Sequence, residues 1–286
     1  MVAGNVSEDP DLDLVQAVIL GIVQGLTEFL PVSSTGHLIL TQRILGIDDK
    51  EFGLQFDAAI HLGTLAAVLL YFRDTFVSLI GAWFKSVAAR RWDVSSQSKL
   101  AWLIILGTIP AGILGLLIQS KAEDAIRSPA IVATMLLLFT LPMLAAERYG
   151  SQERDIDDVT PKDALLVGVA QSIALIPGVS RSGITISAAM FDGFKREQAA
   201  VFTFLLAAPI TAAAGLKQVL DIARGHTEGS TGGAVIAAGV FTSFVVGFAA
   251  IAFLIPYLRT NRLNIFAAYR VVLGVVVLGL VAAGAL

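Results

Sequence analysis

The chain has 286 residues, of which 56% are hydrophobic and only 15% are charged, and its mean hydropathy is +0.77. Soluble domains carry about 25% charged residues, so this composition excludes an ordinary soluble protein and indicates an all-α polytopic membrane protein. The net charge of −3 says little about partners, because it sums loops on opposite sides of a membrane, and nothing in the sequence resembles a nucleic-acid footprint. The lack of cysteine excludes disulfides, thiolate metal sites and cysteine nucleophiles.

The N-terminal part of the chain is predicted to form a broken helical segment near residues 14–45. Its centre, "TEFLPVSSTGHL" at 27–38, places a carboxylate, a histidine, a proline and four hydroxyl residues inside an apolar run. Pro31 cannot continue a helix comfortably, and the hydroxyl residues at 33–35 can cap a following one. We therefore expect a helix, a turn and a second helix here.

Six apolar runs follow, each long enough to cross a hydrocarbon core of about 30 Å as a helix. They lie at 54–72, 100–118, 128–146, 198–222, 233–256 and 264–286. A second polar interruption, "IPGVSRSGIT" at 176–185, lies in a segment near 163–192, between the third and fourth runs. The pattern predicts one integral membrane domain over residues 1–286.

The two interruptions resemble each other. Residues 24–36, "QGLTEFLPVSSTG", align with 171–183, "QSIALIPGVSRSG", at a constant offset of 147. The aligned pairs are Gln24 with Gln171, Val32 with Val179, Ser33 with Ser180, and Gly36 with Gly183. Because the offset is about half the chain, we predict two repeat halves, about 1–146 and 147–286, each with one broken polar element and three spans.

Positive charges predict the orientation. Arg259 and Arg262 flank a short loop near the end, and five basic residues crowd the segment between the first two spans: Arg73, Lys85, Arg90, Arg91 and Lys99. The positive-inside tendency places both segments in the cytoplasm, and six spans then put both termini outside. The broken segments must therefore be re-entrant hairpins that enter from opposite faces, with the halves inverted and the turns meeting near the midplane.

The two turns are predicted to form an anion site. A helix that starts at each turn directs free N–H groups and a positive end at one point, which is how proteins bind phosphate. Arg181 adds a planar guanidinium that can hold phosphate oxygens bidentately. Two helix starts, several hydroxyls and an arginine suit a diphosphate better than a singly charged ligand.

A carboxylate beside this anion site predicts chemistry as well as binding. Gln24 and Glu28 are four residues apart and share one helix face. Because Glu28 would repel a phosphate unless a proton or a divalent cation intervenes, we expect it to hold a cation such as Mg²⁺ or to act as the base for a water. His37, about one turn into the next helix, is suited to proton transfer.

Simpler readings stay open for the same residues. Glu28 and Arg181 can pair with each other for a purely structural purpose, and the serines at the turns can serve only as caps. His61, in "AAIHLGT", is expected to be polar packing, and Asp57 receives no assigned role. The oligomeric state is also left open, with a homodimer among the alternatives.

At these residues the chain resembles the bacitracin-resistance family of undecaprenyl-diphosphate phosphatases. The motifs that carry the resemblance are "GLTEFLPVSSTGHL" in the first half and "PGVSRSGIT" in the second, and the likeness covers essentially the full length. It implies a multi-pass enzyme of the cell membrane that hydrolyses a polyprenyl diphosphate to the monophosphate, recycling the lipid carrier of cell-envelope glycan synthesis. It also implies a divalent cation, Mg²⁺ or Ca²⁺, and a site that faces the extracytoplasmic side.

The resemblance carries roles onto single residues. It implies that Glu28, Ser34, His37 and Arg181 are catalytic, with Glu28 and Gln24 at the cation. It implies that the phosphate-binding residues are Ser33, Thr35, Ser180, Ser182, Gly183 and Thr185. Many members of the family have glutamate where this chain has Gln24, so Glu28 is expected to be the principal carboxylate. Whether Ser34 is a covalent nucleophile or only a phosphate ligand is left open.

A transporter or lipid flippase is the competing interpretation, because inverted repeats with an anion site at the midplane are typical of secondary transporters. A carrier needs no base beside its phosphate site. Glu28 and His37 therefore favour the enzyme.

Overall fold

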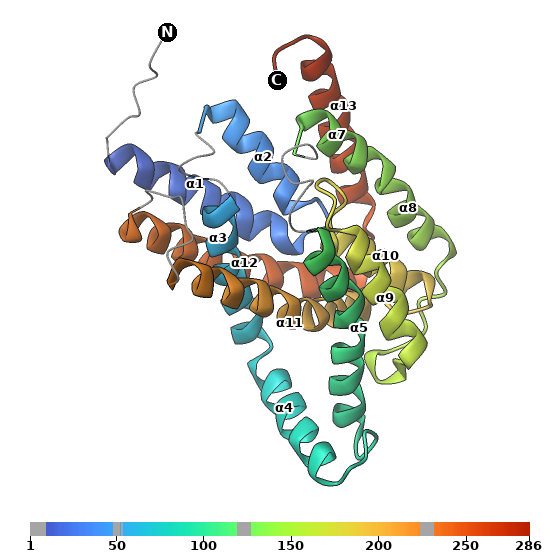
Figure 1. Cartoon of the computed structure of the whole chain (residues 1–286). Helices are drawn as coiled ribbons and strands as arrows, with labels where there is room; N and C mark the ends of the chain where they lie inside the picture. Colours follow the sequence, from blue (N-terminus) through green and yellow to red (C-terminus); the bar gives the residue numbers. More distant parts are fainter. Residues whose placement is uncertain (1–9, 48–51, 53, 119–126, 224–231) are drawn as a thin grey trace.

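The computed structural model describes residues 10–47, 52, 54–118, 127–223 and 232–286, and these form a helical bundle (Figure 1). In this part of the chain the only β contact is an isolated bridge between Arg154 and Phe194. The helices are α1 (Pro10–Phe29), α2 (Ser34–Leu45), α3 (Leu54–Tyr71), α4 (Arg73–Ala88), α5 (Ser96–Ile118), α7 (Pro129–Leu138), α8 (Thr140–Tyr149), the 3₁₀ helix η1 (Ile156–Asp158), α9 (Pro161–Ile173), α10 (Arg181–Phe191), α11 (Arg196–Ala223), α12 (Gly233–Thr260) and α13 (Asn264–Ala282).

Five segments are long and apolar enough to cross a membrane: Ser96–Leu117, Pro129–Tyr149, Arg196–Lys217, Gly233–Thr260 and Asn264–Ala282. The second of these joins α7 to α8 through a short break at Phe139. The remaining expected span is α3, which turns by 81° into α4 and reaches span length only together with it. The prediction of an all-α polytopic membrane protein is confirmed.

Both predicted interruptions are helical hairpins. Residues 30–33 separate α1 from α2, and residues 174–180 separate α9 from α10, so both helix breaks occur at the prolines. None of these four helices is among the candidate spans of the described chain. Their entry from opposite faces of the membrane stays a prediction.

Corresponding helices of the two predicted halves make corresponding contacts. Helix α1 packs against α12, and α9 packs against α5. The backbones approach closely at Gly21, where a Cβ would lie 2.7 Å from the carbonyl oxygen of Gly239; a Cβ on Gly168 would likewise collide with Gly107. Gly21 and Gly168 are 147 residues apart, which is the offset of the repeat. The inverted relation of the halves nevertheless stays a prediction.

The largest apolar core takes buried residues from α3, α5, α8, α9, α10, α11, α12 and α13, so it packs against both helices of the second hairpin. Phe202, Leu205 and Ile251 are fully buried in it. Large apolar side chains also cover the outside, as at Leu116, Phe241 and Val272, where more than half of the side-chain surface is accessible. Such an exterior is typical of helices that face lipid.

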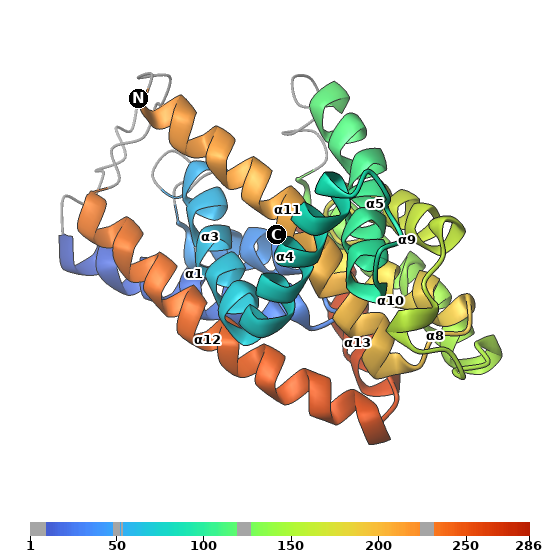
Figure 2. The same ribbon diagram turned by 90° about the horizontal axis from the view of Figure 1, so that it is seen from below.

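Helix α4 and the adjoining end of α5 project from the rest of the molecule (Figure 1). Most of the basic residues predicted to mark the cytoplasmic side lie on this projection, so the expected loop is largely a helix. Seen from below, α12 runs diagonally along one side of the molecule, with α1 and α3 packed against it (Figure 2). Residues 31–33 of the first turn and 177–180 of the second are buried, whereas Leu175 and Ile176 of the second turn are exposed.

Candidate active site

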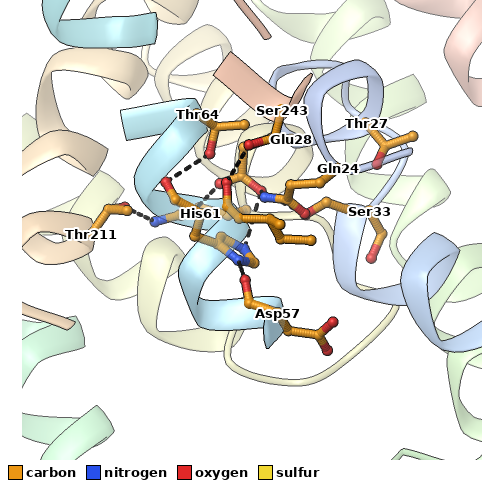
Figure 3. Close-up of polar contacts among 12 residues, drawn as sticks. Gln24, Thr27, Glu28, Ser33, Asp57, His61, Thr64, Thr211 and Ser243 are labelled. Atoms are coloured by element: carbon orange, nitrogen blue, oxygen red, sulfur yellow. Dashed lines mark hydrogen bonds and ion pairs between the residues drawn. The ribbon is translucent and has the colours of Figure 1, made fainter. Parts of the chain in front are cut away.

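Glu28 lies in the last turn of α1, and its carboxylate is the centre of a polar cluster (Figure 3). Oε2 accepts hydrogen bonds from the Ser34 hydroxyl at 2.6 Å and from the Gln24 amide at 3.0 Å. Oε1 forms an ion pair with the Arg181 guanidinium. The expected shared face of Gln24 and Glu28 is therefore present, and it points at the first turn.

Arg181 begins α10 and reaches across to the other hairpin. One of its terminal nitrogens bonds Glu28, and the other donates to the Thr211 hydroxyl of α11 at 2.8 Å. The hydroxyl of Ser182 donates to the Leu30 carbonyl at 3.0 Å, which is a second direct link between the turns. The structure thus brings together the two interruptions, although 153 residues separate Glu28 from Arg181.

The two helix starts share an unusual backbone geometry. Ser33 caps α2 with φ 76° and Ser180 caps α10 with φ 74°, whereas residues other than glycine rarely adopt positive φ. In each turn the serine hydroxyl accepts a hydrogen bond from the backbone N–H three residues later, at Gly36 and at Gly183. Each turn therefore presents the first N–H groups of its helix to the space between the hairpins.

A cavity of about 130 Å³ occupies that space. Its polar lining consists of Glu28, Ser33, Ser34, Thr35, His61, Gln171, Ser180 and Arg181. The Glu28–Arg181 pair is what a purely structural role would also produce. A structural pair alone does not account for a cavity that also collects three hydroxyl residues of one turn and the cap of the other.

His61 was expected to be polar packing, but the structure places it in this cavity. Its Nδ1 lies 2.6 Å from the backbone carbonyl of Asp57, and its Nε2 lies 3.4 Å from Glu28 Oε2 (Figure 3). Because a carbonyl can only accept, Nδ1 carries a proton, and Nε2 faces the carboxylate. His61 therefore lies where a proton on Glu28 can be passed on.

His37, the expected proton-transfer residue, is not among the residues that line the cavity. Its Nδ1 contacts the Ser33 carbonyl at 2.8 Å, and its Nε2 contacts the Tyr269 hydroxyl at 2.7 Å. The two rings are stacked with their centroids 5.6 Å apart. The structure thus joins His37 to α13 behind the turn, and its catalytic role stays a prediction.

Three of the expected phosphate-binding residues also lie outside the cavity lining. Ser182 links the turns, and the Thr185 hydroxyl donates to the Arg181 carbonyl at 2.6 Å. The Gly183 amide is used by the Ser180 cap. These residues shape the start of α10, whereas Ser33, Thr35 and Ser180 face the cavity.

Arg270 of α13 is a functional candidate that sequence reasoning missed. Its side chain is fully buried, and its guanidinium donates to carbonyls of both turns, Pro31 at 3.3 Å and Gly178 at 3.3 Å. It also donates to Leu136 and Thr140 at the break between α7 and α8. An ionisable residue inside an apolar span is a functional signal, so the arginine in "AAYRVVLG" was detectable.

A buried polar network around Asp57 lies next to the site, and the sequence had suggested no role for it. Asp57 accepts a hydrogen bond from Gln42 at 3.1 Å and forms an ion pair with Arg127 at 3.0 Å. Since the Asp57 carbonyl holds His61, this network fixes the orientation of that ring.

The residues around Glu28 fit a divalent cation only in part. The Gln24 Oε1 atom is buried and has no hydrogen-bond partner among the described residues. Together with the Glu28 carboxylate it offers the oxygen donors that Mg²⁺ and Ca²⁺ take. The described chain contains no group of three His, Cys, Asp or Glu side chains that could hold a metal. Gln24 is not among the residues that line the cavity, so of the two expected cation ligands only Glu28 faces the space where the phosphate oxygens of a ligand could complete the coordination.

Known proteins share this sequence almost end to end. Residues 17–276 match the family model described as bacitracin resistance protein BacA. The undecaprenyl-diphosphatase of Mycolicibacterium smegmatis is 46% identical over 272 residues, which is 95% of this chain and 98% of that protein. Those of Kineococcus radiotolerans (44% over 276 residues, 96% of each chain) and Myxococcus xanthus (41% over 275 residues, 96% of this chain and 91% of that protein) are similar. The chain belongs to the bacitracin resistance protein BacA family.

Proposed function

We propose that this protein hydrolyses undecaprenyl diphosphate, or a related polyprenyl diphosphate, to the monophosphate and inorganic phosphate. The observation that carries the proposal is the cavity in which Glu28 and Ser34 of one hairpin face Arg181 of the other. The names of the relatives, undecaprenyl-diphosphatases, support the same activity. In the cell membrane this reaction recycles the lipid carrier of envelope glycan synthesis and accords with the bacitracin resistance of the family name.

The terminal phosphate of the substrate binds between the turns. The starts of α2 and α10 supply backbone N–H groups and the positive ends of two helices. Arg181 supplies a fixed positive charge for oxygens that gain charge in the transition state. Phosphoryl transfer depends mainly on such positioning and charge neutralisation, so this arrangement can provide most of the rate enhancement.

Glu28 is the base of the reaction. It accepts the Ser34 hydroxyl proton across 2.6 Å, which is the geometry of an activated nucleophile. In one route Ser34 attacks the terminal phosphorus, Glu28 takes its proton, and the lipid monophosphate leaves before water releases the phosphate. In the other route Glu28 activates a water and Ser34 holds a phosphate oxygen. His61 receives the proton from Glu28 in either route.

A divalent cation, Mg²⁺ or Ca²⁺, would be held by the oxygens of Glu28 and Gln24 together with those of the substrate. It would supply charge neutralisation at the phosphates. Among the described residues that line the cavity Glu28 is the one carboxylate, so the other lining residues would have to help orient the diphosphate.

The prenyl tail lies outside the cavity. The side chains that line the cavity include a carboxylate, a guanidinium and several hydroxyls, which suit a charged head group and not a prenyl chain. The tail extends between the spans into the bilayer, and the site opens on the extracytoplasmic side.

A flippase or anion transporter is the weaker alternative. A carrier that only moves a phosphate lipid gains nothing from a carboxylate that holds a serine hydroxyl beside the phosphate site. The Glu28–Ser34 hydrogen bond therefore favours hydrolysis.

The test is phosphate release by the purified protein from farnesyl diphosphate and from undecaprenyl diphosphate. We expect release of one phosphate per lipid, its loss on removal of divalent cations with a chelator, and its recovery when Mg²⁺ or Ca²⁺ is added. If the wild-type protein released no phosphate from either lipid while it bound both, the transporter interpretation would take precedence.

A further inference from the structure

Gln171 is the one glutamine of the second hairpin, and it lies in the last turns of α9. The residue is 3% exposed and lines the cavity. Neither its amide nitrogen nor its amide oxygen has a hydrogen-bond partner among the described residues. Buried amides are nearly always paired, and an unpaired one destabilises the fold. An amide that is kept unpaired beside a cavity therefore points to a ligand.

The other hairpin shows what such an amide does. Gln24 lies 147 residues earlier at the aligned position, and its amide nitrogen donates to the Glu28 carboxylate. The position aligned with Glu28 is Leu175, which also lines the cavity. The second hairpin therefore keeps the amide donor but has no carboxylate four residues later to accept its hydrogen bond.

We propose that Gln171 is a substrate-binding residue whose amide nitrogen donates to an oxygen of the diphosphate head group. A phosphate oxygen would accept the hydrogen bond of Gln171, as the Glu28 carboxylate accepts that of Gln24. This inference rests on the proposed function for the identity of the ligand, but the contact requires only an anionic oxygen in the cavity.

The role is one of binding rather than of bond making. Gln171 has no contact with Glu28, Ser34 or Arg181 among the hydrogen bonds and ion pairs of the described residues. Its hydrogen bond should therefore be equally strong to the bound substrate and to the transition state, which changes KM and leaves kcat nearly constant.

The test compares Gln171→Leu with the wild type in detergent or nanodiscs. Because hydrogen bonds to charged groups are strong, we expect KM for farnesyl diphosphate to rise roughly 10- to 100-fold with little change in kcat. We expect Tm without ligand to be equal or higher, because leucine removes an unpaired buried amide. We also expect the increase in Tm caused by inorganic diphosphate to become smaller. Gln171→Glu places a negative charge against the anion and should weaken binding further.

The outcomes separate this inference from the proposed function. If the wild type released no phosphate, the proposed function would fail. The increase in Tm caused by inorganic diphosphate would still test whether Gln171 binds an anion. If Gln171→Leu lowered Tm by several degrees and left KM and the diphosphate shift unchanged, Gln171 would be a structural residue and the inference would be wrong. A fall in kcat at constant KM would overturn the binding role as well.

Discussion

The two hairpins share the backbone geometry of their capping serines but differ in chemistry. Their capping serines differ by only 2° in φ, at 76° and 74°, and both close on the amide of a glycine three residues later. At aligned positions, however, the first hairpin has Glu28 and Ser34 where the second has Leu175 and Arg181. The common geometry makes two anion-binding helix starts, and the substitutions assign proton transfer to one hairpin and charge neutralisation to the other.

The hairpins are also anchored differently. At the base of the second hairpin, Arg154 bonds Asp163 at the start of α9 and Asp192 at the end of α10. The first hairpin has its polar anchor at the side of α2, where Gln42 bonds Asp57 of α3. The tips of the two hairpins, in contrast, share an anchor, because Arg270 donates hydrogen bonds to carbonyls of both turns.

The largest effect is expected where the hairpins differ most. Glu28→Gln keeps the shape of the side chain but cannot take a proton, so kcat should fall roughly 10²- to 10⁴-fold. Phosphate release measures the loss, and circular dichroism with detergent gel filtration checks the fold. Leu175→Met, at the aligned position, is the matched control and should change kcat by less than about twofold. Equal losses at both positions would mean that the hairpins do not divide the chemistry.

Replacing the arginine of the second hairpin should be almost as damaging. Arg181→Ala removes the charge that faces the phosphate, and kcat/KM is expected to fall roughly 10²- to 10³-fold. Arg181→Lys should recover part of the activity, since lysine keeps the charge but loses the planar fork. Arg154→Gln, in the anchor of the same hairpin, should lower Tm and leave turnover largely intact. A variant of Arg181 with full activity would contradict the assignment.

Removing the shared anchor should affect both hairpins together. Arg270→Met leaves carbonyls of both turns without their donor, and misplacement of the turns by about 1 Å would lower activity roughly 10²-fold. The free energy of unfolding should fall by about 1–3 kcal/mol, because buried carbonyls are left without a hydrogen-bond donor. Arg270→Lys should lie between the wild type and Arg270→Met in both activity and the free energy of unfolding. If Arg270→Met kept wild-type activity and Tm, the two turns would not need Arg270 to stay in position.

The smallest effects are expected at the two histidines, and their order is the informative result. His61→Asn removes the proton acceptor next to Glu28 and should lower kcat about tenfold or more. His37→Asn breaks the contact with Tyr269 outside the cavity and should change kcat by only a few fold. Steady-state rates of the two purified variants provide the comparison. A larger loss for His37→Asn would support His37, rather than His61, as the proton-transfer residue.

The sequence predicted the membrane class, the two helix breaks and the meeting of Glu28 with Arg181. These features come from local signals: long apolar runs, prolines beside hydroxyl residues, and a motif repeated at one offset. Such signals are strong because a break in a helix needs particular residues at that place.

The rest of the site depends on rotation and packing, which the sequence does not encode locally. His37 and His61 are both polar residues on apolar helices, and nothing in their neighbourhoods tells which one faces the turns. The structure turns His61 of α3 toward Glu28 and His37 of α2 toward Tyr269. Arg270 is different, since its place in an apolar span was itself a signal, but its partners lie more than 90 residues away.

The positive φ of Ser33 and Ser180 has a consequence for the evolution of this protein. Glycine would adopt that backbone without strain, but it has no hydroxyl to close the turn or to face the cavity. At these two positions, selection for a more relaxed chain and selection for the hydroxyl act in opposite directions. A library screened only for heat resistance would be expected to enrich glycine there and to lose the activity in doing so.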